Sequence, residues 1–498
     1  MRHYKQGISR EQGMLLPKRV DEYVAEDSEV RVVDIYVESL DLEKLGFRNT
    51  GGGLTAGQPA YRPQGLLKLY LYGFLQGIRS SRKLERECVR NLEVIWLLEG
   101  LKPCYKTIAN FRKDNVEGIK AVNRDFVEMC KELELFGKEL AAIDGSYFRG
   151  NVGKKSIYTE KRLKKTLKRL EHYIEDYLAE IERLDAEESD IEDQDNDWGE
   201  KKLAYRETVE KLKERQQKHR ERLKKLQASG EKQLAEVDED ARLLTKNGVT
   251  VVGYNVQAVV DNKHKLIATY EVTRDGNDAR QLAPMAKKVQ QVLEVDELDI
   301  AADKGYYNFG QIKECVDVKI TPYVPEPNKD AQAKSQKRFV RSEFQYQAEN
   351  DCYVCPAGEM LPHNSQCVQK GLLRWIFRSQ PSVCADCPLK ERCLPAEQGF
   401  RSIYRWEHEE VIEVHRQRMA DKGRSMMRLR ACLVEHPFGT LKRWCGWDHF
   451  LLRGLPKVDA EMALYTLGYN FKRVLNILGP DKFRAFCLRR REIAASIG

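Results

Sequence analysis

The sequence predicts a mixed α/β core that follows a helical domain and is interrupted by two insertions. Apolar runs end in a lone aspartate at Asp144 and again at Asp303, with a β-hairpin pattern between them. Residues 155–228 instead carry apolar residues at regular helical spacing. A cysteine-rich stretch follows the second aspartate. These three observations together define the expected architecture.

Length and composition indicate a soluble chain of several domains. The 498 residues allow roughly two to four domains. Charged residues make up 33% and hydrophobic residues 42%, and no apolar run reaches membrane-spanning length. The basic first residues precede no apolar stretch, and the chain holds 13 cysteines. We therefore expect a cytoplasmic protein without a membrane partner, whose cysteines are thiols or metal ligands rather than disulfides.

Residues 1–135 are expected to form an all-helical domain. Apolar residues recur at helical spacing after residues 62–65, where a proline suits a helix start. Shorter helical segments with basic side chains follow at 79–90 and 107–112. Such a domain is typical of DNA binding, and a plain scaffold bundle is an equally good interpretation.

The core is expected to begin at 136–154 and to continue over 240–330. Residues 249–260 and 266–273 are rich in β-branched side chains and are separated by turn residues, which predicts a β-hairpin. A helical pattern at 281–293 then leads to the strand that ends in the second aspartate. We expect these segments to form one α/β unit.

Asp144 and Asp303 are each followed within two residues by glycine. A buried strand that ends in this way delivers a carboxylate to the edge of a sheet, although a lone aspartate there is more often a turn or cap residue. Carboxylates with few other ligand types suit Mg²⁺ or Mn²⁺, and two such ions can drive in-line displacement at a phosphodiester. With Glu435 further along the chain, the pattern predicts a catalytic metal site.

Residues 155–230 are expected to be an antiparallel helical hairpin inserted into the core. Two seams of alternating four- and three-residue spacing are separated by an acidic break at 187–199. An intermolecular coiled coil that dimerises the protein is the alternative. The seam positions are Leu163, Leu167, Leu170, Ile174, Tyr177, Ile181 and Leu184, then Tyr205, Val209, Leu212, Gln216, His219, Leu223 and Leu226.

Residues 340–400 are expected to form a zinc-binding module. Two CxxC pairs occur there, and two thiolates at this spacing form one half of a tetrahedral site. An iron–sulfur cluster or redox thiols are the alternatives. The expected ligands of the structural Zn²⁺ are Cys352, Cys355, Cys384 and Cys387, with Cys393 as the first reserve.

Residues 401–498 are expected to complete the core with a basic segment. They hold 19 Lys and Arg against 11 Asp and Glu, a balance that fits a polyanionic substrate. Glu435 has basic neighbours, and Pro437 predicts a kink or junction there rather than the middle of a helix. Asp448 and Glu461 are rival third carboxylates.

The sequence resembles a known family, the bacterial insertion-sequence transposases of the DDE, ribonuclease H-like class. The resemblance covers most of the chain and includes a branch with a cysteine-rich module between the second Asp and the Glu. The similar blocks, in order, are GLLKLYLYGFLQGIRSSRKLERE, KTIANFR, AIDGS, VGYNVQAVVD, AADKGYYN and VEHPFGTLKR. The implied fold is a ribonuclease H-like mixed sheet flanked by helices.

The resemblance also implies roles for particular residues. Asp144, Asp303 and Glu435 would be the catalytic triad that binds two Mg²⁺ or Mn²⁺ ions. Lys442 follows the Glu at the spacing of the Lys in the family's Tyr-Arg-Glu-Lys signature. Arg430 lies one residue before the expected Arg, and the signature Tyr is missing. The residues expected to contact DNA phosphates are Lys442, Arg443, Arg430 and Arg428.

The implied function is a DNA transposase that cleaves and joins DNA at insertion-sequence ends. Its partner would be double-stranded DNA, both the terminal inverted repeats and the target, and we expect a homodimer associated with the nucleoid. A catalytically inactive, transposase-derived DNA-binding protein is the first alternative. An interaction protein with a zinc ribbon and a coiled-coil dimeriser, in which the aspartates are turn residues, is the second.

Overall fold

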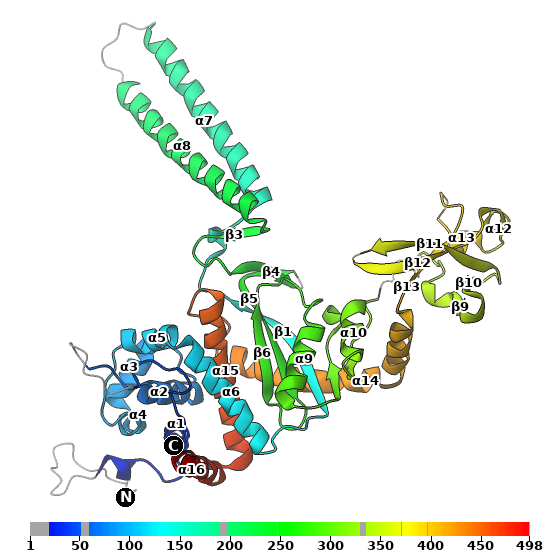
Figure 1. Ribbon diagram of the computed structural model, residues 1–498. Coiled ribbons are helices and arrows are strands. Elements are labelled where there is room, and N and C mark those ends of the chain that lie inside the picture. Colours follow the sequence, from blue (N-terminus) through cyan, green and yellow to red (C-terminus); the bar gives the residue numbers. More distant parts are fainter. Residues whose placement is uncertain are drawn as a thin grey trace, which may run out of the picture.

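A computed structural model describes residues 19–50, 59–189, 198–246, 248–328, 335–369, 371–395 and 397–497. The basic start of the chain and most of the expected acidic break, residues 190–197, lie outside the described residues. Figure 1 shows a central sheet with a helical body on one side, a cysteine-rich module on the other and a long helical hairpin projecting from it. None of the described helices is long and apolar enough to cross a membrane.

The helical body contains the N-terminal helices together with the last two helices of the chain. The N-terminal helices are α1 (Glu29–Glu38), α2 (Pro63–Leu75), α3 (Ser81–Arg90), α4 (Leu92–Leu97), α5 (Tyr105–Asp114) and α6 (Val116–Glu132). The last two helices are α15 (Leu455–Leu478) and α16 (Pro480–Ile497). Rings from both ends of the chain meet, because Tyr36 lies 5.4 Å from Phe126 and 5.5 Å from Phe471 between ring centroids. The sequence had suggested that residues 401–498 belong to the sheet domain alone. Instead, their last two helices pack in the helical body.

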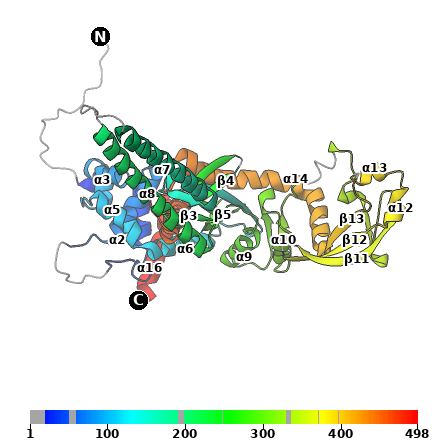
Figure 2. The same ribbon diagram turned by 90° about the horizontal axis from the view of Figure 1, so that it is seen from above.

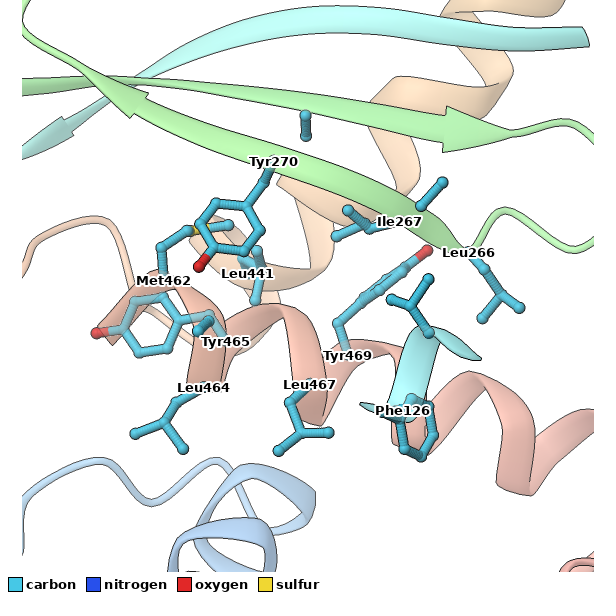
Figure 3. Packing of buried hydrophobic residues seen from close by; sticks show 14 of the residues in the cluster. Phe126, Leu266, Ile267, Tyr270, Leu441, Met462, Leu464, Tyr465, Leu467 and Tyr469 are labelled. Atoms are coloured by element: carbon cyan, nitrogen blue, oxygen red, sulfur yellow. The ribbon is translucent and has the colours of Figure 1, made fainter. Parts of the chain in front are cut away.

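Helix α15 joins this body to the sheet. One side of it presents Met462 and Tyr469 toward Tyr270 and Ile267 of the sheet, while Leu464 and Leu467 point away from it (Figure 3). Buried residues of the helical body and the sheet form one continuous hydrophobic cluster. The sheet and the body are therefore packed as a single unit.

The central sheet has the order β4-β5-β1-β7-β8, with β6 also paired to β5. Strands β5 and β1 are antiparallel, as are β5 and β6, whereas β7 and β8 run parallel to β1. The expected β-hairpin is thus confirmed as β5 and β6. The strands are β1 (Leu140–Arg149), β4 (Arg242–Lys246), β5 (Val249–Asp261), β6 (Ile267–Thr273), β7 (Leu298–Ala301) and β8 (Ile320–Tyr323).

Helices cover both faces of the sheet. Helix α9 (Leu282–Leu293) and helix α10 (Phe309–Val316) lie on one face, and α14 (Glu409–Gly439) crosses the other (Figures 1 and 2). Phe148 of β1 faces Phe438 of α14 at 6.2 Å between ring centroids. Residues of β1 therefore alternate between the α9 side and the α14 side.

The expectation of a kink at Glu435 was wrong. Helix α14 continues through Pro437 to Gly439 and then passes into a π-helical turn over Thr440–Trp444. Pro437 lacks one backbone donor without ending the helix, and Thr440 Oγ1 donates to the His436 carbonyl at 2.7 Å. Glu435 is consequently an ordinary helical position.

The inserted segment forms two long helices that pack on each other within one chain. Helix α7 (Glu160–Ser189) and helix α8 (Trp198–Ser229) lie antiparallel (Figure 1). Ile174, Ile181 and Val209 form a small core of their own, and Tyr177 lies 5.5 Å from Tyr205 between ring centroids. At the root of the hairpin, β2 (Ile157–Thr159) pairs with β3 (Gln233–Ala235).

The cysteine-rich module is a separate antiparallel sheet of order β13-β12-β11-β10-β9. Its own core includes Phe344, Tyr353 and Phe377. The strands are β9 (Gln345–Gln347), β10 (Cys352–Val354), β11 (Met360–Gln369), β12 (Leu372–Arg378) and β13 (Ser402–Trp406), and two short helices, α12 (Pro381–Ala385) and α13 (Lys390–Cys393), lie between β12 and β13.

Candidate active site

The two expected aspartates lie next to each other at the end of the parallel part of the sheet. Ala142 of β1 is in register with Ala301 of β7, where the pairing of these strands ends. Asp144 and Asp303 each follow two residues later. The carboxylates are close enough for the charge of Asp303 to act on Asp144. The sequence had suggested that Asp144 ends its strand, but β1 runs on to Arg149. The neighbouring strand β7 ends at Ala301, two residues before Asp303.

Backbone amides hold both carboxylates. Asp144 Oδ1 accepts a hydrogen bond from the Gly145 amide at 2.9 Å, and Asp303 Oδ1 accepts one from the Gly305 amide at 2.7 Å. Gly145 is required by close approach, since a Cβ atom there would lie 2.6 Å from Asp278 Oδ1. The glycines after each aspartate therefore allow tight packing around the acidic pair.

Two cationic side chains approach this pair. Arg430 Nη1 of α14 lies 3.7 Å from Asp144 Oδ1 and has no hydrogen-bond partner among the described residues, although it is buried. Lys246 Nζ, at the end of β4, donates to the Gly145 carbonyl at 3.3 Å. Burial raises the pKa of Asp144 to about 6, even though Arg430 and Lys246 lower it, and Asp303 raises it further. The charged form of Asp144 thus lacks full compensation within the protein.

A third carboxylate, Asp278, was not expected from the sequence. It is 5% exposed and its Oδ1 accepts hydrogen bonds from Asn255 Nδ2 at 2.8 Å and from Gln257 Nε2 at 2.7 Å. Its Oδ2 lies 3.5 Å from Lys246 Nζ, and the Tyr306 hydroxyl donates to Gln257 Oε1. Asp278 therefore anchors a buried polar network directly behind the pair.

One feature of the sequence points to this network: two polar residues, Asn255 and Gln257, alternate with apolar residues in β5. Asn255 and Gln257 are both fully buried on β5, where side chains two residues apart share a face. A buried amide requires a partner, but the sequence does not identify Asp278 as that partner because it lies in a polar loop.

Glu435 lies on an exposed position of α14, and its side chain makes no hydrogen bond or ion pair with the described residues. The rival Glu461 is fully buried instead, and accepts hydrogen bonds from the amides of Leu451 and Leu452 at 3.0 and 2.9 Å. It also accepts from the Tyr465 hydroxyl at 2.5 Å and lies 3.5 Å from Arg112. This carboxylate is used in holding the fold together and has no free side for a ligand.

Asp448, the other rival, is paired with Arg149 at 2.5 Å and is hydrogen-bonded to His449 at 3.0 Å. These partners lower its pKa, although its partial burial acts in the opposite direction. Its carboxylate is therefore already occupied.

The basic residues expected at DNA differ in their surroundings. Lys442 Nζ donates to Ser146 Oγ at 2.6 Å and to the Tyr147 carbonyl at 2.5 Å, and it lies over the Phe148 ring at 4.3 Å. Burial lowers its pKa to about 8. Lys442 is thus committed to joining the end of α14 to β1. Arg443 and Arg428 are exposed to solvent.

Four cysteines line one small pocket of the separate module: Cys355, Cys384, Cys387 and Cys393. Cys352, an expected ligand, is absent from this pocket and its Sγ faces Gln347 Oε1 at 3.8 Å. Residues three apart on a strand face opposite sides, so the beginning of β10 separates Cys352 from Cys355. Cys393, the expected reserve ligand, lines this pocket, whereas Cys352 does not.

The aspartate pair and the cysteine pocket offer donor atoms that suit different metal ions. In the part of the chain that the structure describes, no group of three or more His, Cys, Asp or Glu side chains is arranged to hold a metal ion. Oxygen donors of Asp144 and Asp303 have the chemistry that Mg²⁺ or Mn²⁺ requires, and the raised pKa of Asp144 indicates uncompensated charge. The four pocket thiols have the donor chemistry that zinc requires.

Comparison with known proteins gives two family matches. Residues 354–475 match the family described as "Transposase DDE domain", and residues 18–114 match "Transposase domain (DUF772)". No curated protein matches the chain. A cryo-EM structure described as a piggyBac transposase synaptic complex with hairpin DNA aligns with a TM-score of 0.31 and 10% identity, over 93% of this chain and 77% of that one. That likeness is too low to support an argument. The two family matches, one in the N-terminal and one in the C-terminal half of the chain, support an insertion-sequence DDE transposase.

Proposed function

We propose that this DNA transposase cuts and joins DNA at the ends of its element by phosphoryl transfer at Asp144 and Asp303. The observation that carries the proposal is their matching position beyond the paired residues Ala142 and Ala301. The strand order β6-β5-β1-β7-β8, with two antiparallel and two parallel pairings, supports a ribonuclease H-like core. This order puts β1 beside β7, so that Asp144 and Asp303 occupy matching positions although they lie far apart in sequence.

Residues of the chain would prepare this site for a polyanionic substrate. Asp144 and Asp303 would hold divalent ions, with Glu435 as the third carboxylate on α14. When bound, two such ions would stabilise the charge on the phosphate and activate the attacking oxygen. Arg430 Nη1 is a buried donor that faces Asp144, and it would donate a hydrogen bond to a phosphate oxygen of the substrate. Lys246 and Asp278 would keep the backbone of Gly145 in place.

An inactive DNA-binding derivative is not favoured, since both Asp144 and Asp303 are present and partly buried. Double-stranded DNA is the proposed partner, both as element ends and as target. Arg443 and Arg428 are exposed and would contact DNA phosphates. Lys442 instead donates a hydrogen bond to Ser146 of β1. Assembly as a homodimer stays a prediction.

The test is cleavage of a plasmid that carries the DNA flanking both ends of the gene. We expect the purified full chain to nick or cut this plasmid with Mg²⁺ or Mn²⁺ and to be inactive with a chelator. Asp144→Asn should abolish cleavage and leave DNA binding nearly unchanged. Asp317→Asn is a matched control, because that side chain is half exposed and, among the described residues, forms an ion pair with Lys313 alone, at the end of α10. Equal cleavage by Asp144→Asn and the parent would refute the assignment.

A further inference from the structure

A strongly basic cavity lies at the root of the helical hairpin, outside the site described above. It is open to solvent, has a volume of about 710 Å³ and is lined by residues of the turn before β2, of β2 itself and of α7 and α8. Its lining includes one aromatic ring, Tyr158, and the buried His219. The seven basic residues that line it are Lys155, Arg162, Lys165, Arg169, Arg215, Lys218 and Arg222.

The pairing of these residues differs from that of the rest of the hairpin. On its outer faces Lys164 pairs with Glu160 at 2.7 Å, Lys211 with Glu207 at 3.6 Å and Arg183 with Glu180 at 2.6 Å. Within the described chain, no residue lining the cavity carries a carboxylate, and only Arg222 reaches one outside it, Glu236. A surface that merely solubilises two helices would interleave the signs of charge, as the outer faces do.

The side chains are also arranged around the cavity rather than spread away from it. Arg222 and Arg162 lie over the Tyr158 ring, with 4.6 and 5.6 Å from each guanidinium carbon to the ring centroid. Burial lowers the pKa of His219, and the positive charges of Arg222 and Arg215 lower it further. The cavity is therefore a region of concentrated positive potential that an anion would relieve.

We propose that this basic cavity binds the phosphate backbone of double-stranded DNA. The inference rests on the proposed function and adds a second DNA contact, on the inserted hairpin rather than at Asp144 and Asp303. Guanidinium and ammonium groups around a concave surface match successive phosphates, and they carry no sequence information. The hairpin would thus hold DNA while its root stays joined to the sheet through β2 and β3.

The test compares two double variants of the full chain, both in the Asp144→Asn background so that no DNA is cut. Arg169→Gln with Lys218→Gln removes two cavity charges, and Lys168→Gln with Lys213→Gln removes two exposed charges from the same helices outside the cavity. The probe is a mixed-sequence duplex of about 40 base pairs, titrated over a range of salt concentrations.

The cavity variant should bind more weakly, and its plot of log affinity against log salt should be shallower by about 1.8, because each lost phosphate contact removes about 0.9. The control should keep the parent slope within about 0.5. Relief of like-charge repulsion should leave the melting temperature of the cavity variant equal or higher. Should it unfold instead, Lys165→Gln with Arg215→Gln removes two other cavity charges and must give the same change of slope.

Equal slopes for the cavity and control variants would overturn this inference and leave the proposed function standing. Loss confined to an RNA duplex, with duplex DNA unaffected, would overturn it too, by assigning the cavity to another nucleic acid. Failure of the unsubstituted chain to bind any DNA would overturn both proposals.

Discussion

Asp144 and Asp303 each lie two residues beyond a register pair, Ala142 and Ala301, although 158 positions separate them in the chain. Because β1 and β7 are parallel, their side chains leave the sheet at the same edge. This relationship is independent of the helices that surround it. The Asp144 and Asp303 motifs of the sequence therefore meet at one place in the sheet.

The identity of the third carboxylate can be decided by comparing Glu435→Gln with Glu461→Gln. Glu435→Gln should abolish cleavage with little change in the free energy of unfolding, because its side chain makes no ion pair among the described residues. Glu461→Gln should destabilise the protein by about 2–4 kcal/mol, since it breaks a buried carboxylate network with Arg112 and two backbone amides. Denaturant unfolding and the cleavage assay measure the two effects. Full cleavage by Glu435→Gln would remove Glu435 from the site.

Lowering the pH should reduce the free energy of unfolding, because the buried His415 of α14 must then take up a proton. This side chain is 1% exposed and its Nε2 accepts a hydrogen bond from the Val324 amide at 3.4 Å, just past β8. Burial lowers its pKa to about 4, aided by Arg418 and Arg416 and opposed by Glu326. The unfolded chain binds a proton at higher pH than the folded one, so stability is fully present above about pH 6.5 and is lost as pH falls toward 4.

The expected loss from this group is at most about 3 kcal/mol at pH 4. His415→Gln should abolish that part of the pH dependence, because glutamine keeps an acceptor for the Val324 amide without titrating. His408→Gln, a change at a partly exposed histidine near the start of α14, should follow the parent curve. Denaturant midpoints measured between pH 4 and 7.5 give the comparison. Parallel curves for His415→Gln and the parent would contradict the prediction.

The zinc prediction concerns the four thiols that share a pocket. We propose that Cys355, Cys384, Cys387 and Cys393 hold one structural zinc ion, and metal analysis should find about one zinc per chain. Cys393→Ser should lose the zinc and destabilise the module, whereas Cys352→Ser should keep it, because Cys352 faces Gln347. Zinc-free protein with freely alkylated cysteines would refute the site, and zinc loss in Cys352→Ser would restore the original ligand set.

Shortening the hairpin should leave the rest of the protein folded. The change removes the outer halves of α7 and α8 and joins the stubs by a short loop, so that the small core around Ile181 is lost while the root at β2 and β3 stays. The ends of such an insertion are already close, so little loop entropy changes. Circular dichroism and the melting temperature of the shortened chain, compared with the parent, check this. Loss of the sheet domain, or loss of a dimer that the parent forms, would show that the hairpin has a wider role.

By itself the sequence determined those features that depend on local pattern. Runs of β-branched residues on either side of a turn predicted β5 and β6, the helical seams predicted α7 and α8, and an apolar run before each aspartate predicted that Asp144 and Asp303 belong to strands. Residues close in the chain and the periodicity of burial carry this information.

Only the tertiary structure decided the contacts between distant segments. It placed Asp278 behind the acidic pair, engaged Lys442 with Ser146, and separated Cys352 from the other thiols. It also attached α15 and α16 to the N-terminal helices and continued α14 as a helix past Pro437. None of these follows from a local pattern, because each depends on which buried polar or apolar surface meets which partner when the layers pack.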